Sequence, residues 1–363
     1  MAMKYFSMFS GIGGFEYGIQ RAFDKQLTEV KQDGQGWNRD INQVEHNVLP
    51  TSRITPLCVG YSEIDKYAIK VYERNFNGHK NYGDCTAIDA QQLPDFDLLV
   101  GGFPCQAFSI AGKRYGFQDT RGTLFFDIGR ILANKRPRHL VLENVKGLLS
   151  HDNGKTFQTI IGVLTDLGYT VEWQVLNSKD FGVPQNRERV IIVGHLGAEC
   201  SGQVFPIIGA DYEDTRIVGQ DVAYTIDANY AKGTNTLAKS RRSIVVKGML
   251  NSEKWQKFNE SSRRVYDTDG IAPTIPTVAG GGHTPKIDTD ARIRRLTPTE
   301  CERLQGFPDD WTKYGEDEHG MRVDISDTQR YKMCGNAVTT NVIQAVISKL
   351  FAITKSDTPP REH

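Results

Sequence analysis

The feature that most constrains the fold of this chain is the alternation of short apolar runs with amphipathic stretches along its first half. The apolar runs lie at residues 4–9, 57–61, 97–100, 139–143 and 189–194, and the amphipathic stretches between them lie at 15–23, 64–75, 123–134 and 156–167. Strands that alternate with helices in this way form a mostly parallel sheet with helices on both faces. The sequence therefore predicts an α/β fold.

Two regions do not follow this alternation. Residues 24–56 are polar and weakly periodic, so we predict an insertion within the first domain. From residue 198 onward, strand-like pieces alternate with glycine- and threonine-rich stretches, and the next helices are expected at 299–304 and 341–351. We therefore predict a first domain at 1–197, a second, smaller and irregular domain at 198–292, and a return to the first domain at 293–363.

Composition limits the class of protein. The chain has 363 residues, 39% of them hydrophobic, with 44 basic and 44 acidic residues. It contains neither an apolar run long enough to span a membrane nor a signal-peptide core, so we expect a cytoplasmic protein with no membrane partner. The six cysteines lack the spacing of metal ligands or of a disulfide framework, so we expect no metal. Between Lys239 and Arg303 there are 13 basic against 8 acidic residues, which indicates either a phosphate-contacting surface or an ordinary solvated face.

A glycine-rich turn at residues 9–14 follows the first predicted strand. In a parallel sheet, ligands bind beyond the carboxyl ends of the strands, and small residues there let a cofactor lie against the backbone. Glu63 follows the second strand, where a carboxylate can accept from both hydroxyls of a ribose, and Asp84 could accept from an adenine amino group. Taken alone, each acid would be interpreted as a surface or capping residue. Together with the turn, they predict a site for an adenosine-bearing cofactor.

Cys105 follows the third predicted strand in the turn Gly-Gly-Phe-Pro-Cys. A cysteine is most often a small buried hydrophobic residue, but a tight turn at a strand end is a poor place to bury one. Glu143 ends the fourth strand, and Arg187 and Arg189 begin the next. A thiolate, an acid and an arginine suit a pyrimidine ring: the thiolate adds at C6, the acid donates at N3 and the arginine holds O2. The ring's C5 could then take a methyl group from a sulfonium donor.

Eight motifs in this order resemble those of the DNA (cytosine-5)-methyltransferases, in particular the bacterial and phage enzymes of type II restriction-modification. They span nearly the whole chain, and they are Phe9-Ser-Gly-Ile-Gly-Gly-Phe15, Glu63, Gly83-Asp84, Gly102-Phe-Pro-Cys-Gln106, Glu143-Asn-Val145, Gln185-Asn-Arg-Glu-Arg189, the stretch from Arg294 to Pro308, and Gly335-Asn-Ala-Val338. The resemblance implies a Rossmann-like S-adenosylmethionine-dependent methyltransferase domain with a smaller target-recognition domain.

The resemblance also implies a reaction and the residues that perform it. A methyl group would pass to C5 of a cytosine flipped out of a short duplex DNA sequence, through a covalent adduct of Cys105 at C6. Cys105 would be the nucleophile, Glu143 the acid, and Arg187 and Arg189 the groups that steady the ring and its pocket. The residues implied to bind S-adenosylmethionine, and the product S-adenosylhomocysteine, are Phe9, Gly11, Ile12, Gly13, Gly14, Glu63, Asp84, Pro104, Asn336 and Val338.

Contacts to double-stranded DNA are implied at two places. Residues 106–122 resemble the loop that closes on DNA, with Ser109, Lys113, Arg114 and Arg121 as candidate contacts, and the recognition segment offers Arg264, Tyr266, Thr274 and Gly281. With this resemblance, the basic excess is better interpreted as phosphate-contacting. We expect a monomer in restriction-modification or phage self-protection, whose cognate restriction endonuclease acts on the same site without stable contact.

Three alternatives stay open. A tRNA cytosine-5 methyltransferase shares most of these motifs but has a shorter recognition region. A DNA-binding regulator that has lost the chemistry would keep the fold, although every catalytic position here carries the expected residue type. A dinucleotide oxidoreductase would explain the glycine turn but not the cysteine, glutamate and arginines at the strand ends. The DNA target and the role of residues 24–56 do not follow from the sequence.

Overall fold

A six-stranded sheet forms the centre of the computed structural model, which describes residues 3–33, 56–104, 124–197, 204–208, 246–249, 263–267, 271–276, 284–288 and 293–356. The strand order is β2-β1-β3-β4-β7-β5, with bounds β1 Met3–Met8, β2 Pro56–Ser62, β3 Leu98–Gly102, β4 His139–Val145, β5 Tyr169–Asn177 and β7 Glu188–Leu196. The first four strands are parallel, which confirms the predicted α/β fold.

Strand β7 runs antiparallel to both of its neighbours, β4 and β5. Its first residues therefore lie at the same edge of the sheet as the carboxyl end of β4, and Arg189 is the register partner of Val145. Had β7 been parallel, the side chains that open it would lie at the opposite edge. The reversed strand brings the arginine segment to the ends of β1–β4.

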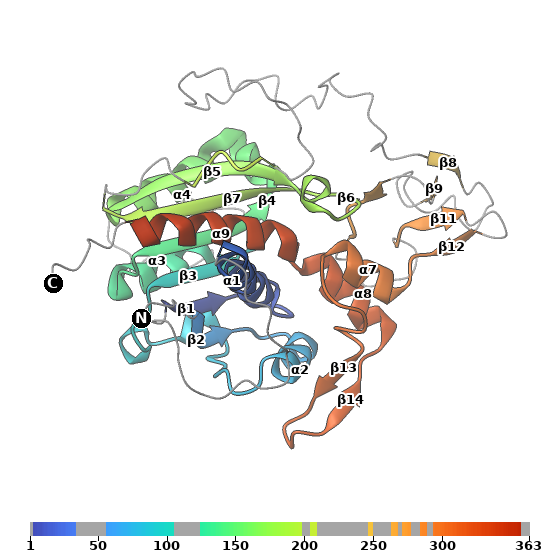
Figure 1. Cartoon of the computed structure of the whole chain (residues 1–363), viewed down its shortest axis with the longest axis horizontal. Helices are drawn as coiled ribbons and strands as arrows, with labels where there is room; N and C mark the ends of the chain where they lie inside the picture. The colour runs from blue at the N-terminus through green and yellow to red at the C-terminus, as the bar shows by residue number, and fades with distance from the viewer. Residues whose placement is uncertain are drawn as a thin grey trace.

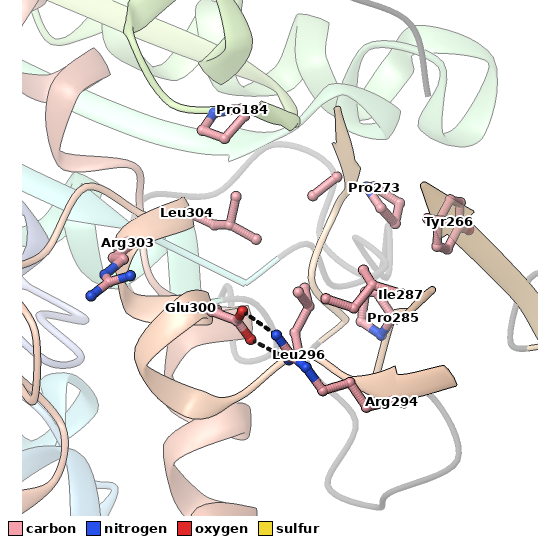
Figure 2. Close-up of a pocket in the computed structure, with 11 residues that line it drawn as sticks. Pro184, Tyr266, Pro273, Pro285, Ile287, Arg294, Leu296, Glu300, Arg303 and Leu304 are labelled. Atoms are coloured by element: carbon pink, nitrogen blue, oxygen red, sulfur yellow. Dashed lines mark hydrogen bonds and ion pairs between the residues drawn. The ribbon is translucent and has the colours of Figure 1, made fainter. Parts of the chain in front are cut away.

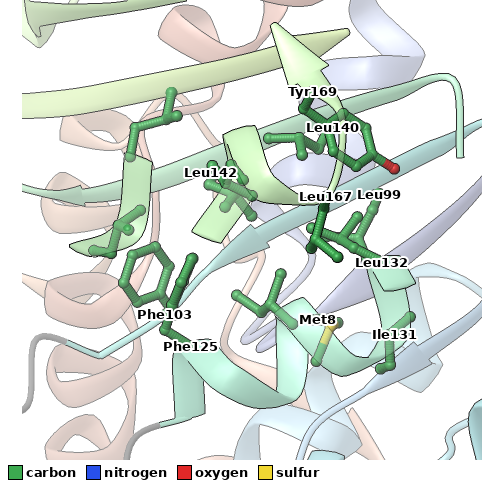
Figure 3. Packing of buried hydrophobic residues seen from close by; sticks show 14 of the residues in the cluster. Met8, Leu99, Phe103, Phe125, Ile131, Leu132, Leu140, Leu142, Leu167 and Tyr169 are labelled. Carbon is green, nitrogen blue, oxygen red and sulfur yellow. The ribbon is translucent and has the colours of Figure 1, made fainter. Parts of the chain in front are cut away.

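Helices cover both faces of the sheet, as Figure 1 shows. On one face, α3 (Leu124–Lys135) and α4 (Lys155–Asp166) bury apolar side chains against Leu99, Leu140 and Leu142, which appear in Figure 3. On the other face, α1 (Gly14–Asp33) packs with α9 (Thr340–Ser356) over Val100 and Val141. Successive strand residues point to opposite faces, so both cores share the same strands.

The remaining elements are shorter. Helix α2 is Lys66–Asn75, α7 is Pro298–Leu304 and α8 is Asp327–Asn336. Single turns of 3₁₀-helix lie at η1 Cys85–Ala87, η2 Ala90–Gln92, η3 Lys146–Leu149, η4 His151–Gly154 and η5 Ser178–Phe181. Helix α7 begins with a capping box, because Thr297 accepts from the amide of Glu300 and Glu300 accepts from the amide of Thr297.

Three small sheets lie outside the central one. Strand β6 (Gln185–Asn186) pairs with β10 (Ala272–Pro273), and β13 (Tyr314–Glu316) forms a hairpin with β14 (Arg322–Asp324). A four-stranded sheet has the order β12-β11-β9-β8, with bounds β12 Ile293–Arg295, β11 Lys286–Asp288, β9 Arg264–Asp267 and β8 Val246–Met249. The proposed domain borders stay predictions, while α1 continues to Asp33, beyond the helix end expected at residue 23. Within the described ranges, no helix has the length and apolar character needed to cross a membrane.

Candidate active site

The candidate site lies where β1, β2, β3 and β4 end and β7 begins. Phe9 follows β1, Glu63 follows β2 and Pro104 lies just beyond β3. Because the carboxyl ends of parallel strands share one edge of the sheet, these residues and Glu143 on β4 face the same region. This edge is where open α/β sheets bind their ligands.

The glycine turn after β1 is shaped by left-handed backbone and close packing. Phe9 and Gly11 both have φ of 55°, a conformation that is costly for phenylalanine. A Cβ atom on Gly13 would lie 2.1 Å from the ring of Phe76, so only glycine fits there. The amide of Gly11 donates to Glu63 Oε2 over 2.8 Å. This hydrogen bond holds the glycine turn against Glu63, the acid that follows β2.

Glu63 is a half-buried carboxylate that its own backbone already orients. Its Oε1 accepts from the amides of Ile64 and Asp65, each over 2.8 Å. A carboxylate has about four lone-pair positions, and the amides of Gly11, Ile64 and Asp65 occupy three of them, so acceptor capacity is left for one hydroxyl group, at Oε2. Asp84, in contrast, accepts from the amide and hydroxyl of Thr86 as the cap of η1, although the residue is exposed.

The acid Glu143 is buried and faces an arginine. Its Oε1 lies 2.9 Å from Arg189 Nε, with both side chains less than a fifth exposed. A Cβ atom on Gly102 would lie 3.3 Å from Glu143 Oε2, so the glycine lets the acid approach the strand end that leads to Pro104. Asn144 Nδ2 donates to the carbonyl of Phe103 over 2.9 Å and fixes that strand end against β4. Asn144 was part of a predicted motif, but its role was not predicted.

Arg187 has a different set of partners from Arg189. Its side chain is 2% exposed, and Nη2 donates to the carbonyls of Gly335 and Ala337 over 3.2 and 2.7 Å. Burial, and next the charge of Arg189, lower the pKa of Arg187 to about 9, which still leaves it protonated at neutral pH. The two arginines were predicted to steady the ring and its pocket; in the structure Arg187 binds backbone carbonyls at the end of α8, and Arg189 faces Glu143.

Two residues that were predicted to contact DNA make contacts within the protein instead. Tyr266 is 7% exposed and lines a cavity of about 310 Å³ with Pro184, Pro273 and Leu304, as Figure 2 shows. The hydroxyl of Thr274 donates to the carbonyl of Asn186 over 2.6 Å. Tyr266 therefore packs inside rather than facing outward, and Thr274 joins the recognition segment to β6. Arg264 is half-buried in β9.

The comparison with known families decides the class of the chain. Residues 3–352 match the family model described as C-5 cytosine-specific DNA methylase. The chain belongs to this family. It is a DNA cytosine-5-methyltransferase, and the match extends from β1 through the glycine turn into the last helix.

Relatives of this methylase include bacterial enzymes of similar length. The type II methyltransferase M.NlaX of Neisseria lactamica is 36% identical over 354 residues, which are 96% of each chain. The type II methyltransferase M.HhaI of Haemophilus parahaemolyticus is 38% identical over 302 residues, or 80% of this chain and 86% of the relative. The solved structure of S. pombe Dnmt2 methyltransferase has a TM-score of 0.61 at 18% identity and covers 97% of this methylase and 99% of that chain, which shows the shared fold.

The family implies S-adenosylmethionine as the methyl donor, and the residues of this methylase fit an adenosine group. A free acceptor capacity at Glu63 lies beside the glycine turn, and Gly14 allows Val338 to approach so closely that a Cβ atom would lie 2.7 Å from it. Ile64, an apolar side chain that is 72% exposed, stands next to Glu63 and is a candidate cofactor contact that was not predicted from the sequence. An apolar residue directly after the acid at a strand end is the signal that could have found it.

The other predicted cofactor residues differ in exposure. Phe9 is half-buried, Pro104 and Asn336 are exposed, and Val338 is buried. Ile12 is 1% exposed within the cluster that contains Phe307, so a cofactor could reach only its backbone. Cys105, Ser109, Lys113, Arg114, Arg121 and Gly281 lie outside the described residues. Among the side chains that the structure describes, no group of His, Cys, Asp and Glu is arranged to hold a metal ion.

Proposed function

We propose that this methylase transfers a methyl group from S-adenosylmethionine to C5 of a cytosine rotated out of a short duplex DNA sequence, with Cys105 as the nucleophile at C6. The observation that carries the proposal is the buried pair of Glu143 and Arg189, which lies against Gly102 two residues before Pro104. Cys105 is the residue directly after Pro104, so it lies three residues along the chain from Gly102.

The proposed reaction begins with the ring of cytosine. The Cys105 thiolate forms a bond to C6, the double-bond electrons shift through C5 and C4 to N3, and Glu143 donates a proton to N3. The resulting electron-rich C5 takes the methyl group, for which S-adenosylmethionine supplies an electrophilic carbon on a sulfonium. As the methyl carbon leaves the sulfonium, which would depart as S-adenosylhomocysteine, the N3 proton returns to Glu143, and loss of the C5 proton to water and of the Cys105 thiolate then restores the aromatic ring. Each bond formed is matched by one that breaks.

The residues around the acid would determine where the ring binds. Arg189 would share its guanidinium between Glu143 and O2 of the cytosine, so the ring is held at two edges by charge-assisted hydrogen bonds. Asn144 would keep the end of β3 in register with β4 and so fix the origin of the turn that carries Cys105. Such preorganised groups lower the barrier because they need no rearrangement during reaction.

Duplex DNA must open for this chemistry. A base inside the double helix cannot reach a buried acid, so the cytosine has to leave the stack, at a cost of a few kcal/mol. Contacts to phosphates in the basic region from Lys239 to Arg303 would offset part of that cost. Several relatives are type II methyltransferases, which supports a place in restriction-modification or phage self-protection beside an endonuclease of the same target.

The test is bisulfite sequencing of plasmid DNA from cells that lack cytosine methylation of their own. Cells expressing the intact protein should show protected cytosines in one short recurring context, and cells expressing Cys105→Ala should show none. Protection that persists with Cys105→Ala would contradict the covalent mechanism. If neither DNA is protected while tRNA from the same cells carries 5-methylcytosine, the substrate assignment would be wrong.

A further inference from the structure

The end of helix α8 is closed by a residue from another part of the chain. A helix leaves its last carbonyl groups without partners inside the helix, and these groups carry the negative end of the helix dipole. At α8, the carbonyl of Gly335 and that of the cap residue Ala337 both accept from Arg187 Nη2. Arg187 precedes Ala337 by 150 residues, so a distant cation closes this helix.

The residue after Ala337 lies between the cofactor turn and the acid. A Cβ atom on Gly14 would lie 2.7 Å from Val338 Cγ2, and one on Gly102 would lie 3.6 Å from Val338 Cγ1 and 3.3 Å from Glu143 Oε2. Val338 therefore contacts the glycine turn on one side and approaches the strand end beside Glu143 on the other. A shift of Ala337 would move this side chain in both places.

The backbone of Arg187 is itself held in place. Its amide donates to Asn177 Oδ1 over 3.0 Å, and its carbonyl accepts from the amide of Ser178 over 3.0 Å. The hydroxyl of Ser178 lies 2.8 Å from that of Thr339, on the far side of Val338. The segment around Arg187 thus grips the turn from α8 to α9 at Gly335, Ala337 and Thr339.

From these contacts we infer that Arg187 is a positioning residue for the cofactor wall, by which we mean the turn at residues 335–339 beside the proposed cofactor site. Arg187 is then not a group that touches the cytosine. It holds the turn that carries Asn336 and Val338, whereas Arg189, two residues further on, serves the ring together with Glu143. The inference rests on the proposed roles of Glu143 and S-adenosylmethionine, and it assigns the two arginines of the Gln185–Arg189 motif to two different sites.

A direct contact of Arg187 with the ring is the competing interpretation. Arg187 Nε and Nη1 are buried without a hydrogen-bond partner among the described residues, and Glu143 is close enough to influence the pKa of Arg187. If those nitrogens bound the base, loss of Arg187 would leave cofactor binding in the absence of DNA unchanged. A positioning role predicts that cofactor binding suffers even when no DNA is present.

The experiment is titration calorimetry with S-adenosylhomocysteine in the absence of DNA, on the whole chain and three variants. Arg187→Met removes the charge and keeps the volume, and we expect affinity to fall about tenfold, since part of two charge-assisted hydrogen bonds is lost from the wall. Arg187→Lys keeps one donor and should restore most of the affinity. The matched control is Arg136→Met, which removes an arginine donor from the carbonyl of Leu167 at the end of α4, and its affinity should stay within about twofold of wild type.

Steady-state kinetics provides the second measurement. For Arg187→Met and Arg187→Lys, we expect the KM for S-adenosylmethionine to rise more than kcat falls. Normal affinity for S-adenosylhomocysteine in both Arg187 variants, together with a loss confined to kcat, would overturn the positioning role and favour contact with the base. An equal loss of affinity in Arg136→Met would also overturn it, because the effect would then be general instability. Absence of binding by wild type would instead contradict the proposed function.

Discussion

At the scale of single residues, Glu16 is a buried acid that the proposed reaction does not use. It lies in the first turn of α1, and Tyr72 Oη donates to its Oε1 over 3.1 Å. The same hydroxyl lies 3.0 Å from His79 Nδ1. Burial raises the pKa of Glu16 to about 7, although hydrogen bonds from Ser7 and Tyr72 act in the opposite direction.

This shift predicts how stability changes with pH. The stability that Glu16 contributes is complete below the unfolded pKa of about 4.3 and is lost as pH rises through 7, because the unfolded chain ionises more easily. Glu16→Gln should remove this loss, so the variant gains up to about 3 kcal/mol relative to wild type between pH 5 and 8. Urea unfolding across this range measures the difference, with the exposed Glu318→Gln as control. Equal pH slopes in Glu16→Gln and wild type would show that Glu16 is not the group responsible.

The proposed role of Glu143 as the acid can be tested at the same scale. Glu143→Gln keeps the shape of the side chain but cannot act as the acid, so we expect the single-turnover rate to fall about 10²- to 10⁴-fold. DNA affinity should change far less. The control is Glu188→Gln on the neighbouring strand β7, since the side chain of Glu188 pairs with Lys146 rather than with Arg189. An equal loss of rate and DNA binding in Glu143→Gln would assign Glu143 a structural role.

At the scale of elements, the sequence predicted those strands and helices that have a clear hydrophobic period. The runs at 57–61 and 139–143 became β2 and β4, and the stretches at 123–134 and 156–167 became α3 and α4 within a residue or two. The direction of β7 did not follow from its apolar run, because the same alternation suits either direction. Strand β5 at the sheet edge is half-buried on both faces, and α8 is mostly polar, so neither showed a period.

The site was predictable for a similar reason. Glu63 and Glu143 stand at strand ends, and position at a strand end is visible in the sequence. The hydrogen bonds of Arg187 were not predictable, because they depend on where α8 ends, in a segment far along the chain. The burial of Tyr266 likewise depends on residues from several separate segments that line one cavity.

Two glycines in helices provide a test of packing at this scale. Gly18 in α1 faces α9, and a Cβ atom there would lie 2.7 Å from Ile343 Cβ and 3.1 Å from the carbonyl of Thr340. Alanine is the better helix former by about 1 kcal/mol, but overpacking costs about 1–3 kcal/mol, so we expect Gly18→Ala to destabilise the protein. Gly162 in α4 has open space around it, and Gly162→Ala should stabilise by up to about 1 kcal/mol. Thermal unfolding of both variants measures the two effects. If both substitutions stabilise the protein, α1 and α9 can move apart at little cost.

At the scale of the whole molecule, Gln305 joins helices that are far apart in sequence. Its side chain is fully buried, Nε2 donates to the carbonyl of Cys334 over 2.7 Å, and Oε1 accepts from the hydroxyl of Thr339 over 2.9 Å. Figure 1 shows α7 and α8 between the central sheet and strands β8–β12. Gln305 therefore lies where the two parts of the molecule connect.

Removing that connection should cost much more than removing a surface ion pair. Gln305→Leu removes the side-chain donor from the buried carbonyl of Cys334 and one of the two partners of the Thr339 hydroxyl, which keeps Ser178, and we expect a loss of about 1–3 kcal/mol in the free energy of unfolding. Arg303→Met breaks the exposed pair with Asp309 and should cost much less, because solvent screens the attraction between two exposed charges. Urea denaturation of each variant measures both values. Similar losses would show that water replaces the hydrogen bonds of Gln305.

The pairing of β6 with β10 has a consequence for how such enzymes acquire new targets. Two residue pairs, Ala272 with Gln185 and Pro273 with Asn186, join the predicted recognition segment to the chain just before Arg187. This pairing is made by backbone groups and by the Thr274 hydroxyl. It therefore does not depend on the side chains that would contact the bases of the target. A recognition segment exchanged between relatives would dock in the same place if it kept this short stretch. Evolution could thus rewrite the target of such an enzyme while its chemistry stays untouched.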